Sequence, residues 1–182
     1  PQDRAYSVPQ LFEFIEGAAL RFGRWVRQAP YVPQCGAVAG IPQLSRITAL
    51  PQAEQYAALE LFRGTMVRHS LVAYRNDDRT GAAAVTFDGD AWLGYRPIRL
   101  PGTLAIRERL PAGAAAVLIN PDHRYTDLYL PINATQERML QAIDGERTIA
   151  GICAPEERQL ARTFFEQLFR WDQIVLDTAR AA

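Results

Sequence analysis

Residues 133–178, NATQERMLQAIDGERTIAGICAPEERQLARTFFEQLFRWDQIVLDT, decide the fold of the last third of the chain. Asn133 is a residue type favoured at helix N-caps. Apolar residues then recur at the spacing of one helical face, at Met139, Leu140 and Ile143. Asp144 and Gly145 are predicted to end this helix in a tight turn. The pattern therefore predicts a helix over residues 133–143.

Two further helices and a strand are predicted after this first helix. Thr148 can cap a short helix over residues 149–153. Pro155 is suited to the first turn of a longer helix, whose inward face is predicted to hold Leu160, Phe164 and Leu168. Residues 172–178 are predicted to form a closing strand. The order helix, short helix, longer helix, strand indicates a winged-helix-like unit over residues 125–182.

The middle region, residues 37–124, predicts short helices followed by strands. Helices are expected over residues 44–50 and 52–63. The apolar face of the second is expected at Tyr56, Leu59 and Phe62, and Gly64 is its expected stop. The sequence Asp88-Gly89-Asp90 is a hairpin signal, flanked by expected strands at residues 83–87 and 92–95. Further strands are expected at residues 67–74, 104–109 and 115–119, with a helical turn over residues 104–110 as the alternative to the second. A short strand at residues 128–130 belongs to the region that follows. The sequence therefore predicts an α+β fold with a small, mostly antiparallel sheet and helices, followed by the winged-helix-like unit.

The first region, residues 1–36, predicts one helix and one strand. Ser7 can cap the helix, with Gln10 three positions on as in a capping box. The apolar face is expected at Leu11, Phe12, Phe14 and Ile15. Gly17 is the expected stop, and the strand over residues 20–27 carries Gly23 as an expected bulge.

The charge balance is even, with 20 basic and 20 acidic residues among 182. A neutral chain gains little from phosphate attraction, so we expect no nucleic-acid partner. Every basic residue is arginine, and without lysine the chain forms neither a Schiff base nor a phosphate-binding P-loop. No apolar run approaches the ~20 residues of a membrane span and no secretory leader is recognisable. We therefore expect a cytoplasmic protein without a membrane partner.

The residues that usually carry catalysis are isolated in this sequence. His69 and His123 have no second histidine or cysteine nearby, whereas a zinc site uses three or four such ligands. Cys35 and Cys153 are expected to be small buried apolar groups. No catalytic, cofactor-binding or metal-ligating residue is therefore assigned. An enzyme whose residues meet only in the fold stays open, and a pocket that joins either histidine to carboxylates would favour it.

One segment has the composition of a protein-binding surface. Tryptophan, tyrosine and arginine dominate the residues that contribute most to protein interfaces. They gather, with a glutamine, at Arg24, Trp25, Arg27, Gln28 and Tyr31. The alternative is that Trp25 is part of the core and the arginines are solvated.

The same region carries a family resemblance. Residues 1–11 (PQDRAYSVPQL), 19–22 (ALRF) and 24–31 (RWVRQAPY) resemble the end of class I S-adenosylmethionine-dependent methyltransferases of bacteria. There a late helix precedes a Gly-Leu-x-Phe strand that closes the sheet. Ala18-Ala19-Leu20-Arg21-Phe22 takes that place here, with the glycine displaced to Gly17.

This resemblance implies a non-catalytic C-terminal accessory or regulatory region that contributes to substrate choice or dimerisation. The chain begins at Pro1 rather than Met, so we expect a piece of a longer protein. S-adenosylmethionine would then bind an upstream methyltransferase domain, which becomes the expected partner together with a second copy in a homodimer. No cofactor is expected in residues 1–182.

The last third resembles a second family, the small winged-helix peptide binders that serve peptide-modifying enzymes. The resemblance rests on residues 133–135, 143–145 and 147–149, with Leu140 and Ile152. It implies a module that binds a peptide or protein substrate. An exposed groove beside the helix that starts at Pro155 would favour this function, whereas an N-terminal strand at an open sheet edge would favour the methyltransferase region.

Overall fold

A computed structural model describes residues 5–77 and 85–178 of the chain. The fold is α+β, as predicted, and every strand pair found among these residues is antiparallel. The chain divides into two compact units, Pro1–Ala84 and Val85–Ala182, called here the N-terminal unit and the C-terminal unit.

These units do not follow the predicted boundaries at residues 36 and 124. In the N-terminal unit, a strand at residues 20–25 pairs with one at residues 71–75, which encloses the predicted boundary near residue 36. In the C-terminal unit, a strand at residues 96–99 pairs with one at residues 174–177, which encloses the boundary near residue 124. Strand pairing between distant segments therefore sets the division, and composition along the chain does not reveal it.

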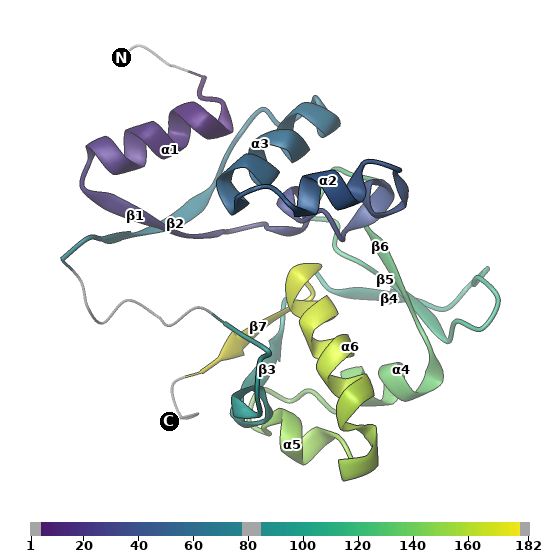
Figure 1. Cartoon of the computed structure of the whole chain (residues 1–182). Helices are drawn as coiled ribbons and strands as arrows, with labels where there is room; N and C mark the ends of the chain where they lie inside the picture. The colour runs from purple at the N-terminus through teal and green to yellow at the C-terminus, as the bar shows by residue number, and fades with distance from the viewer. Residues whose placement is uncertain (1–4, 78–84, 179–182) are drawn as a thin grey trace. The chain divides into compact units, whose positions relative to one another are not determined.

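The N-terminal unit consists of helices packed on a two-stranded ribbon. In Figure 1, α1 and α3 lie on the same side of the β1–β2 ribbon. In chain order its elements are α1 (Val8–Gly17), β1 (Leu20–Trp25), the 3-10 turns η1 (Ala29–Tyr31) and η2 (Gly36–Gly40), α2 (Leu44–Thr48), α3 (Gln52–Arg63) and β2 (Leu71–Arg75).

Local signals for these elements are confirmed. The Ser7 backbone N–H donates to Gln10 Oε1 at 3.1 Å, which is one half of the predicted capping box. Gly64 ends α3 in the left-handed conformation, with φ 63°, where glycine is favoured. Phe14 and Phe62 differ from expectation because both are exposed. In each of these two helices, therefore, fewer apolar residues are buried than the apolar pattern predicts.

The predicted bulge at Gly23 is also confirmed. The register of β1 against β2 shifts between Phe22 and Arg24. The ring of Tyr74 lies over the glycine, so that a Cβ there would be 2.4 Å from Tyr74 Cε2 and 2.9 Å from the Val72 carbonyl oxygen. Glycine is therefore required at position 23, because the Tyr74 ring and the Val72 backbone approach it closely. The bulge also lets both Phe22 and Trp25 contact the core.

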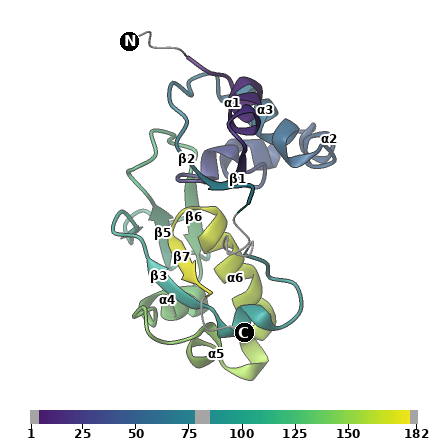
Figure 2. The same cartoon turned by 90° about the vertical axis from the view of Figure 1, so that its left-hand side faces the viewer.

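The C-terminal unit holds two small sheets and three α-helices among its described residues. Its elements are η3 (Ala91–Gly94), β3 (Arg96–Arg99), β4 (Leu104–Ile106), β5 (Ala116–Ile119), β6 (Tyr129–Ile132), α4 (Ala134–Gln141), α5 (Ile149–Ile152), η4 (Pro155–Glu157), α6 (Arg158–Arg170) and β7 (Ile174–Asp177). One sheet pairs β3 with β7, side by side in Figure 2, and the other has the order β4-β5-β6.

The first two helices of the C-terminal unit begin where the sequence predicts, whereas the helix predicted from Pro155 starts with the 3-10 turn η4 and becomes α6 only at Arg158. Asn133 Oδ1 accepts from the backbone N–H of Gln136 at 3.0 Å, and Gln136 Oε1 accepts from the backbone N–H of Asn133 at 2.9 Å. The predicted inward residues of α4 are buried, as are Phe164 and Leu168 of α6. These side chains pack with Leu118, Leu130 and Ile132 of the sheet in one continuous core.

The predicted hairpin around Asp88-Gly89-Asp90 is wrong. Residues 92–95 contain part of the 3-10 turn η3 instead of a strand, residues 85–87 form no strand, and residues 83 and 84 lie outside the described residues. The physical reason is that the aromatic side chains turn inward. Trp92 Nε1 donates to the Gly89 carbonyl at 3.0 Å, and Tyr95 Oη donates to the Thr86 carbonyl at 3.1 Å.

No helix in the described part of the chain combines the length and apolar character needed to cross a lipid bilayer.

Candidate functional site

The segment predicted to contact a partner runs from the end of β1 into η1, and the structure divides it. Trp25 and Tyr31 are only 1% and 5% exposed. Their rings stack with centroids 4.0 Å apart and planes at 9°. Both rings therefore belong to the core of the N-terminal unit and hold the segment in place.

The three polar residues of this segment lie nearer the surface. Arg27 is exposed, whereas Arg24 and Gln28 are half-buried. Arg24 Nε donates to the carbonyl of Trp25 at 3.2 Å, and the carbonyl of Gln28 accepts from the backbone N–H of Tyr31 at 2.8 Å. A contact with another protein through Arg24, Arg27 and Gln28 stays a prediction, with Trp25 and Tyr31 as their support.

Tyr31 also begins a chain of polar contacts that the sequence did not predict. Its Oη lies 2.7 Å from His69 Nδ1, and His69 Nε2 lies 3.2 Å from Glu60 Oε1. Glu60 Oε2 accepts from the backbone N–H of Val8 at 2.8 Å. A carboxylate at a helix N-terminus is electrostatically favourable. The contacts therefore link η1, the segment before β2, α3 and α1.

The rings of Tyr31 and His69 also belong to a cluster of aromatic contacts. The other rings of this cluster are Phe12, Phe22, Trp25 and Tyr56. Burial raises the pKa of Tyr56 to about 12. Trp25 Nε1 has no hydrogen-bond partner among the described residues. The contacts of Tyr31, His69 and Glu60, called here the His69 cluster, link segments of the N-terminal unit beside these rings.

His123 lies in the C-terminal unit and meets a different carboxylate. Its Nε2 is 3.3 Å from Asp172 Oδ2, and both side chains are almost fully buried. Asn120 Nδ2 donates to the Asp172 carbonyl at 2.7 Å, and Thr103 Oγ1 donates to the Gln173 carbonyl at 2.6 Å. These contacts join the segments after β3 and β5 to the turn between α6 and β7.

The turn that carries Asp172 explains why the closing strand starts later than predicted. Asp172 has a φ of 52°, a left-handed conformation that aspartate tolerates better than most residues. The backbone N–H of Gln173 donates to the carbonyl of Leu168 at 2.9 Å, which closes the end of α6. The chain is therefore still in a helix-terminal turn at residues 172–173, and β7 begins at Ile174.

The serines and cysteines of the described residues differ in exposure. Ser45 and Ser70 are exposed, both cysteines are buried, and burial raises the pKa of the Cys153 thiol, which disfavours the thiolate. Among residues 5–77 and 85–178, no group of three or more His, Cys, Asp or Glu side chains is placed to hold a metal ion.

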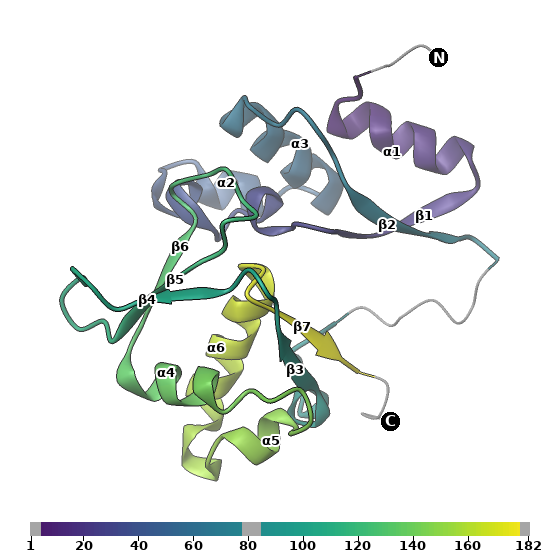
Figure 3. The same cartoon turned by 180° about the vertical axis from the view of Figure 1, so that it is seen from behind.

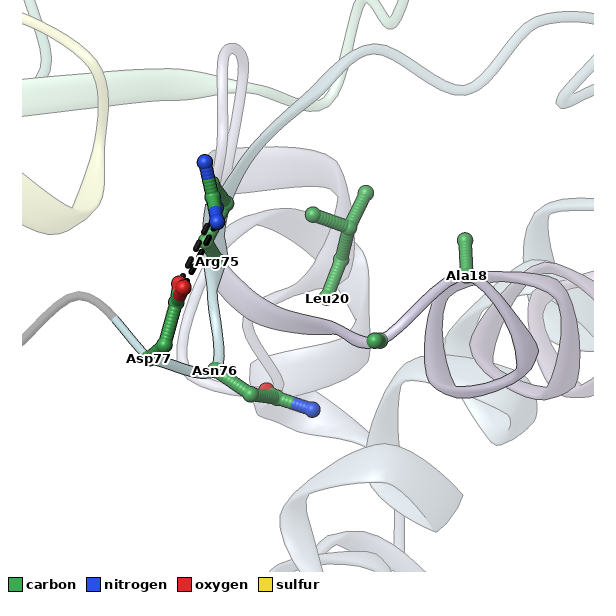
Figure 4. Close-up of a pocket in the computed structure, with 6 residues that line it drawn as sticks. Ala18, Leu20, Arg75, Asn76 and Asp77 are labelled. Carbon is green, nitrogen blue, oxygen red and sulfur yellow. Dashed lines mark hydrogen bonds and ion pairs between the residues drawn. The ribbon is translucent and has the colours of Figure 1, made fainter.

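A hollow of about 390 Å³ lies elsewhere, at the end of the β1–β2 ribbon (Figure 4). Arg75 and Asp77 face one another there through hydrogen bonds of 2.6 and 2.9 Å. The remaining lining residues are Ala18, Ala19, Leu20 and Asn76. Among the described lining residues, Asp77 carries the one carboxylate, and it is paired with Arg75.

Comparison with known proteins adds no assignment to this geometry. No protein-family model matches the sequence, and no curated protein matches it.

Proposed function

We propose that this chain is a non-catalytic accessory or regulatory C-terminal region of an S-adenosylmethionine-dependent methyltransferase, contributing to substrate choice or dimerisation. Methyl transfer and cofactor binding would take place in an upstream methyltransferase domain, which is the proposed partner. The observation that carries the proposal is the ribbon formed by β1 and β2. Among the described residues each strand pairs only with the other.

The ribbon has the form of the end of a larger sheet. A helix, α1, leads directly into β1, in the segment that resembles the closing elements of the methyltransferase sheet. A two-stranded sheet is marginal by itself, and its open edges present backbone groups that pair readily with another strand. An upstream sheet would satisfy those groups, which favours the accessory region over a self-contained domain.

The arrangement of reactive groups supports a non-catalytic role. Both histidines meet carboxylates, as an enzyme formed only in the fold would require. However, His69 and His123 are each enclosed by packing contacts, and neither lines the hollow beside Arg75. A pair held inside the packed part of each unit links distant segments of the chain, which supports a structural role over a catalytic one.

Isothermal titration calorimetry tests this proposal. S-adenosylmethionine is titrated into residues 1–182 and, separately, into the complete product of the gene. We expect binding by the complete product and none by residues 1–182. Binding by residues 1–182 would contradict the proposal because the cofactor site would then lie in this chain. Absence of binding by the complete product would contradict it equally.

A winged-helix peptide- or protein-binding module of a modifying enzyme is the second candidate. The observation that favours it is the order α4, α5, α6 and β7, which matches the order that the resemblance implies. Titration of a mixed pool of unstructured peptides into isotope-labelled protein tests it. Amide shifts confined to α6 and its neighbours would support the module, and unchanged spectra would exclude it for such peptides.

A further inference from the structure

The β1–β2 ribbon has two faces of different chemistry. Its register places Phe22 opposite Ala73 and Trp25 opposite Leu71, and residues directly opposite one another share a face. Trp25 is buried, and Phe22 and Leu71 pack against the same core. In Figure 1 and again in Figure 3, α1 and α3 both lie on one side of the ribbon. The face with Trp25 is therefore the inner face.

The outer face, called here the arginine face, is formed by Arg21, Arg24, Val72 and Tyr74. Arg21 lies opposite Tyr74, and Arg24 lies opposite Val72. Because Val72 and Tyr74 are two positions apart on one strand, both pairs belong to the same face. Arg21 and Val72 are exposed, whereas Arg24 and Tyr74 are half-buried. This face therefore presents two guanidinium groups beside an aromatic and an apolar side chain.

Contacts within the ribbon order both guanidinium groups. The Arg21 guanidinium carbon lies 5.0 Å from the centre of the Tyr74 ring, and the Tyr74 ring lies over the bulge at Gly23. Arg24 Nε donates to the Trp25 carbonyl at 3.2 Å. A ring or a carbonyl orders a cation without cancelling its charge. Side chains that are already ordered in the free protein lose less entropy when a partner binds.

Two further arginines stand beside one end of the arginine face. The backbone N–H of Val26 donates to the Ser70 carbonyl at 2.9 Å, which continues the pairing of the two strands. Arg27 follows Val26 directly, and Arg68 precedes Ser70 by two positions. Both arginines are exposed. The positive charge therefore extends beyond the arginine face at this end of the ribbon.

The charge of the ribbon is of one sign. Residues 19–32 and 64–76 contain the ribbon, and neither segment includes an aspartate or a glutamate. Arg75 lies opposite Leu20 on the inner face and forms an ion pair with Asp77, so it is not part of the arginine face. A guanidinium group binds a carboxylate through two parallel hydrogen bonds. A partner that complements the arginine face is therefore acidic.

We propose that the arginine face binds an acidic protein segment, whose aspartate and glutamate side chains pair with Arg21 and Arg24. Arginine is among the residues that contribute most to protein interfaces. A nucleic acid fits less well, because the chain carries as many acidic as basic residues and gains little from phosphate attraction. This inference rests on the proposed function for its biological role, since it names the class of substrate or partner that the accessory region selects.

Fluorescence anisotropy of a labelled oligoglutamate peptide, titrated with residues 1–182, tests the inference. The wild-type chain is expected to bind the peptide, and less tightly as salt rises, because the face is open to solvent. Arg21→Glu combined with Arg24→Glu sets like charges against the peptide and is expected to weaken binding at least about tenfold. Arg46→Glu combined with Arg99→Glu is the matched control, because both residues are exposed, lie outside the ribbon and change the net charge equally.

Absence of oligoglutamate binding by the wild-type chain would overturn the inference. So would an equal loss in the control, or tighter binding of an oligothymidylate of the same charge, which would indicate a nucleic-acid surface. If circular dichroism shows that the Arg21→Glu and Arg24→Glu chain is unfolded, Arg21→Gln combined with Arg24→Gln replaces it, and unchanged binding by that folded chain would overturn the inference too. Cofactor titration is measured separately, so the loss of this site and the loss of the methyltransferase assignment are distinguishable results.

Discussion

The two units of the chain reach stability in different ways. The N-terminal unit has few fully buried side chains in its cluster, Val8, Trp25 and Tyr31, and completes it with half-buried rings. The C-terminal unit has a continuous core built on α4, α6 and the β4–β5–β6 sheet. Small cores bury a smaller fraction of their surface, so the N-terminal unit depends more strongly on each ring and on the His69 contacts.

The largest expected effect compares one buried aromatic residue in each unit. Trp25→Ala and Phe164→Ala each remove about 3–5 kcal/mol of stability. We expect the loss to unfold the N-terminal unit, whereas the larger C-terminal unit stays folded. Amide spectra recorded in increasing urea follow both units in one sample. Phe14→Ala is the control because Phe14 is exposed, and an equal response of the two units would break the comparison.

Removal of one carboxylate charge from each histidine cluster gives the next effect. Asp172→Asn preserves a residue tolerated at positive φ and leaves His123 without its charged partner, for an expected loss of about 1.5–3 kcal/mol. Glu60→Gln is expected to lower the stability by less, because Glu60 is more exposed than Asp172. Water can therefore solvate the polar atoms that lose their charged partner. Urea unfolding measures both, and a larger loss for Glu60→Gln would reverse the ranking.

Glycine replacements sharpen the description of the ribbon. Gly23→Ala forces its Cβ against Tyr74 and the Val72 backbone, and overpacking of this kind costs about 1–3 kcal/mol. Gly17→Ala is the matched control, since nothing lies within 4 Å of a Cβ there. Thermal unfolding of the N-terminal unit distinguishes the two. Equal melting temperatures would show that the bulge relaxes without strain.

The last effect is confined to alkaline pH and is absent at neutral pH. Burial raises the pKa of Tyr56 from 10.0 to about 12, so the folded state retains a proton that the unfolded state loses. The contribution of Tyr56 to the free energy of unfolding is fully present below pH 10 and is lost as the pH rises toward 12. Tyr56→Phe is expected to remove that part of the pH dependence of the unfolding free energy. An identical alkaline slope in the variant would show that Tyr56 is solvated.

Local sequence signals predicted most of the helices and the bulge. Ser7, Asn133 and Gly64 act through hydrogen bonds or backbone conformations that need only a few neighbouring residues, so a single sequence reveals them. The hairpin near Gly89 failed for the opposite reason. Its turn signal is real, but Trp92 and Tyr95 gain more by packing into the core than by extending a strand.

Composition alone indicated that residues 24–31 contact other groups. Only the fold shows which of these side chains face the core and which face water. Arg24, Trp25, Arg27, Gln28 and Tyr31 are adjacent in sequence, yet the two rings face the core while Arg27 faces water. Residue type predicts that such side chains contact something. It does not predict whether the contact is another protein or the interior of the same one.

The sequence by itself determined the fold class, the local starts and stops of helices, and the chemistry that the absence of lysine excludes. Only the tertiary structure decided which carboxylate each histidine meets and which side chains form the arginine face. Glu60 and Asp172 stand 9 and 49 positions from His69 and His123 along the printed sequence (69 − 60 and 172 − 123). Such pairs form by strand register and helix packing, which couple segments whose spacing in the chain carries no signal.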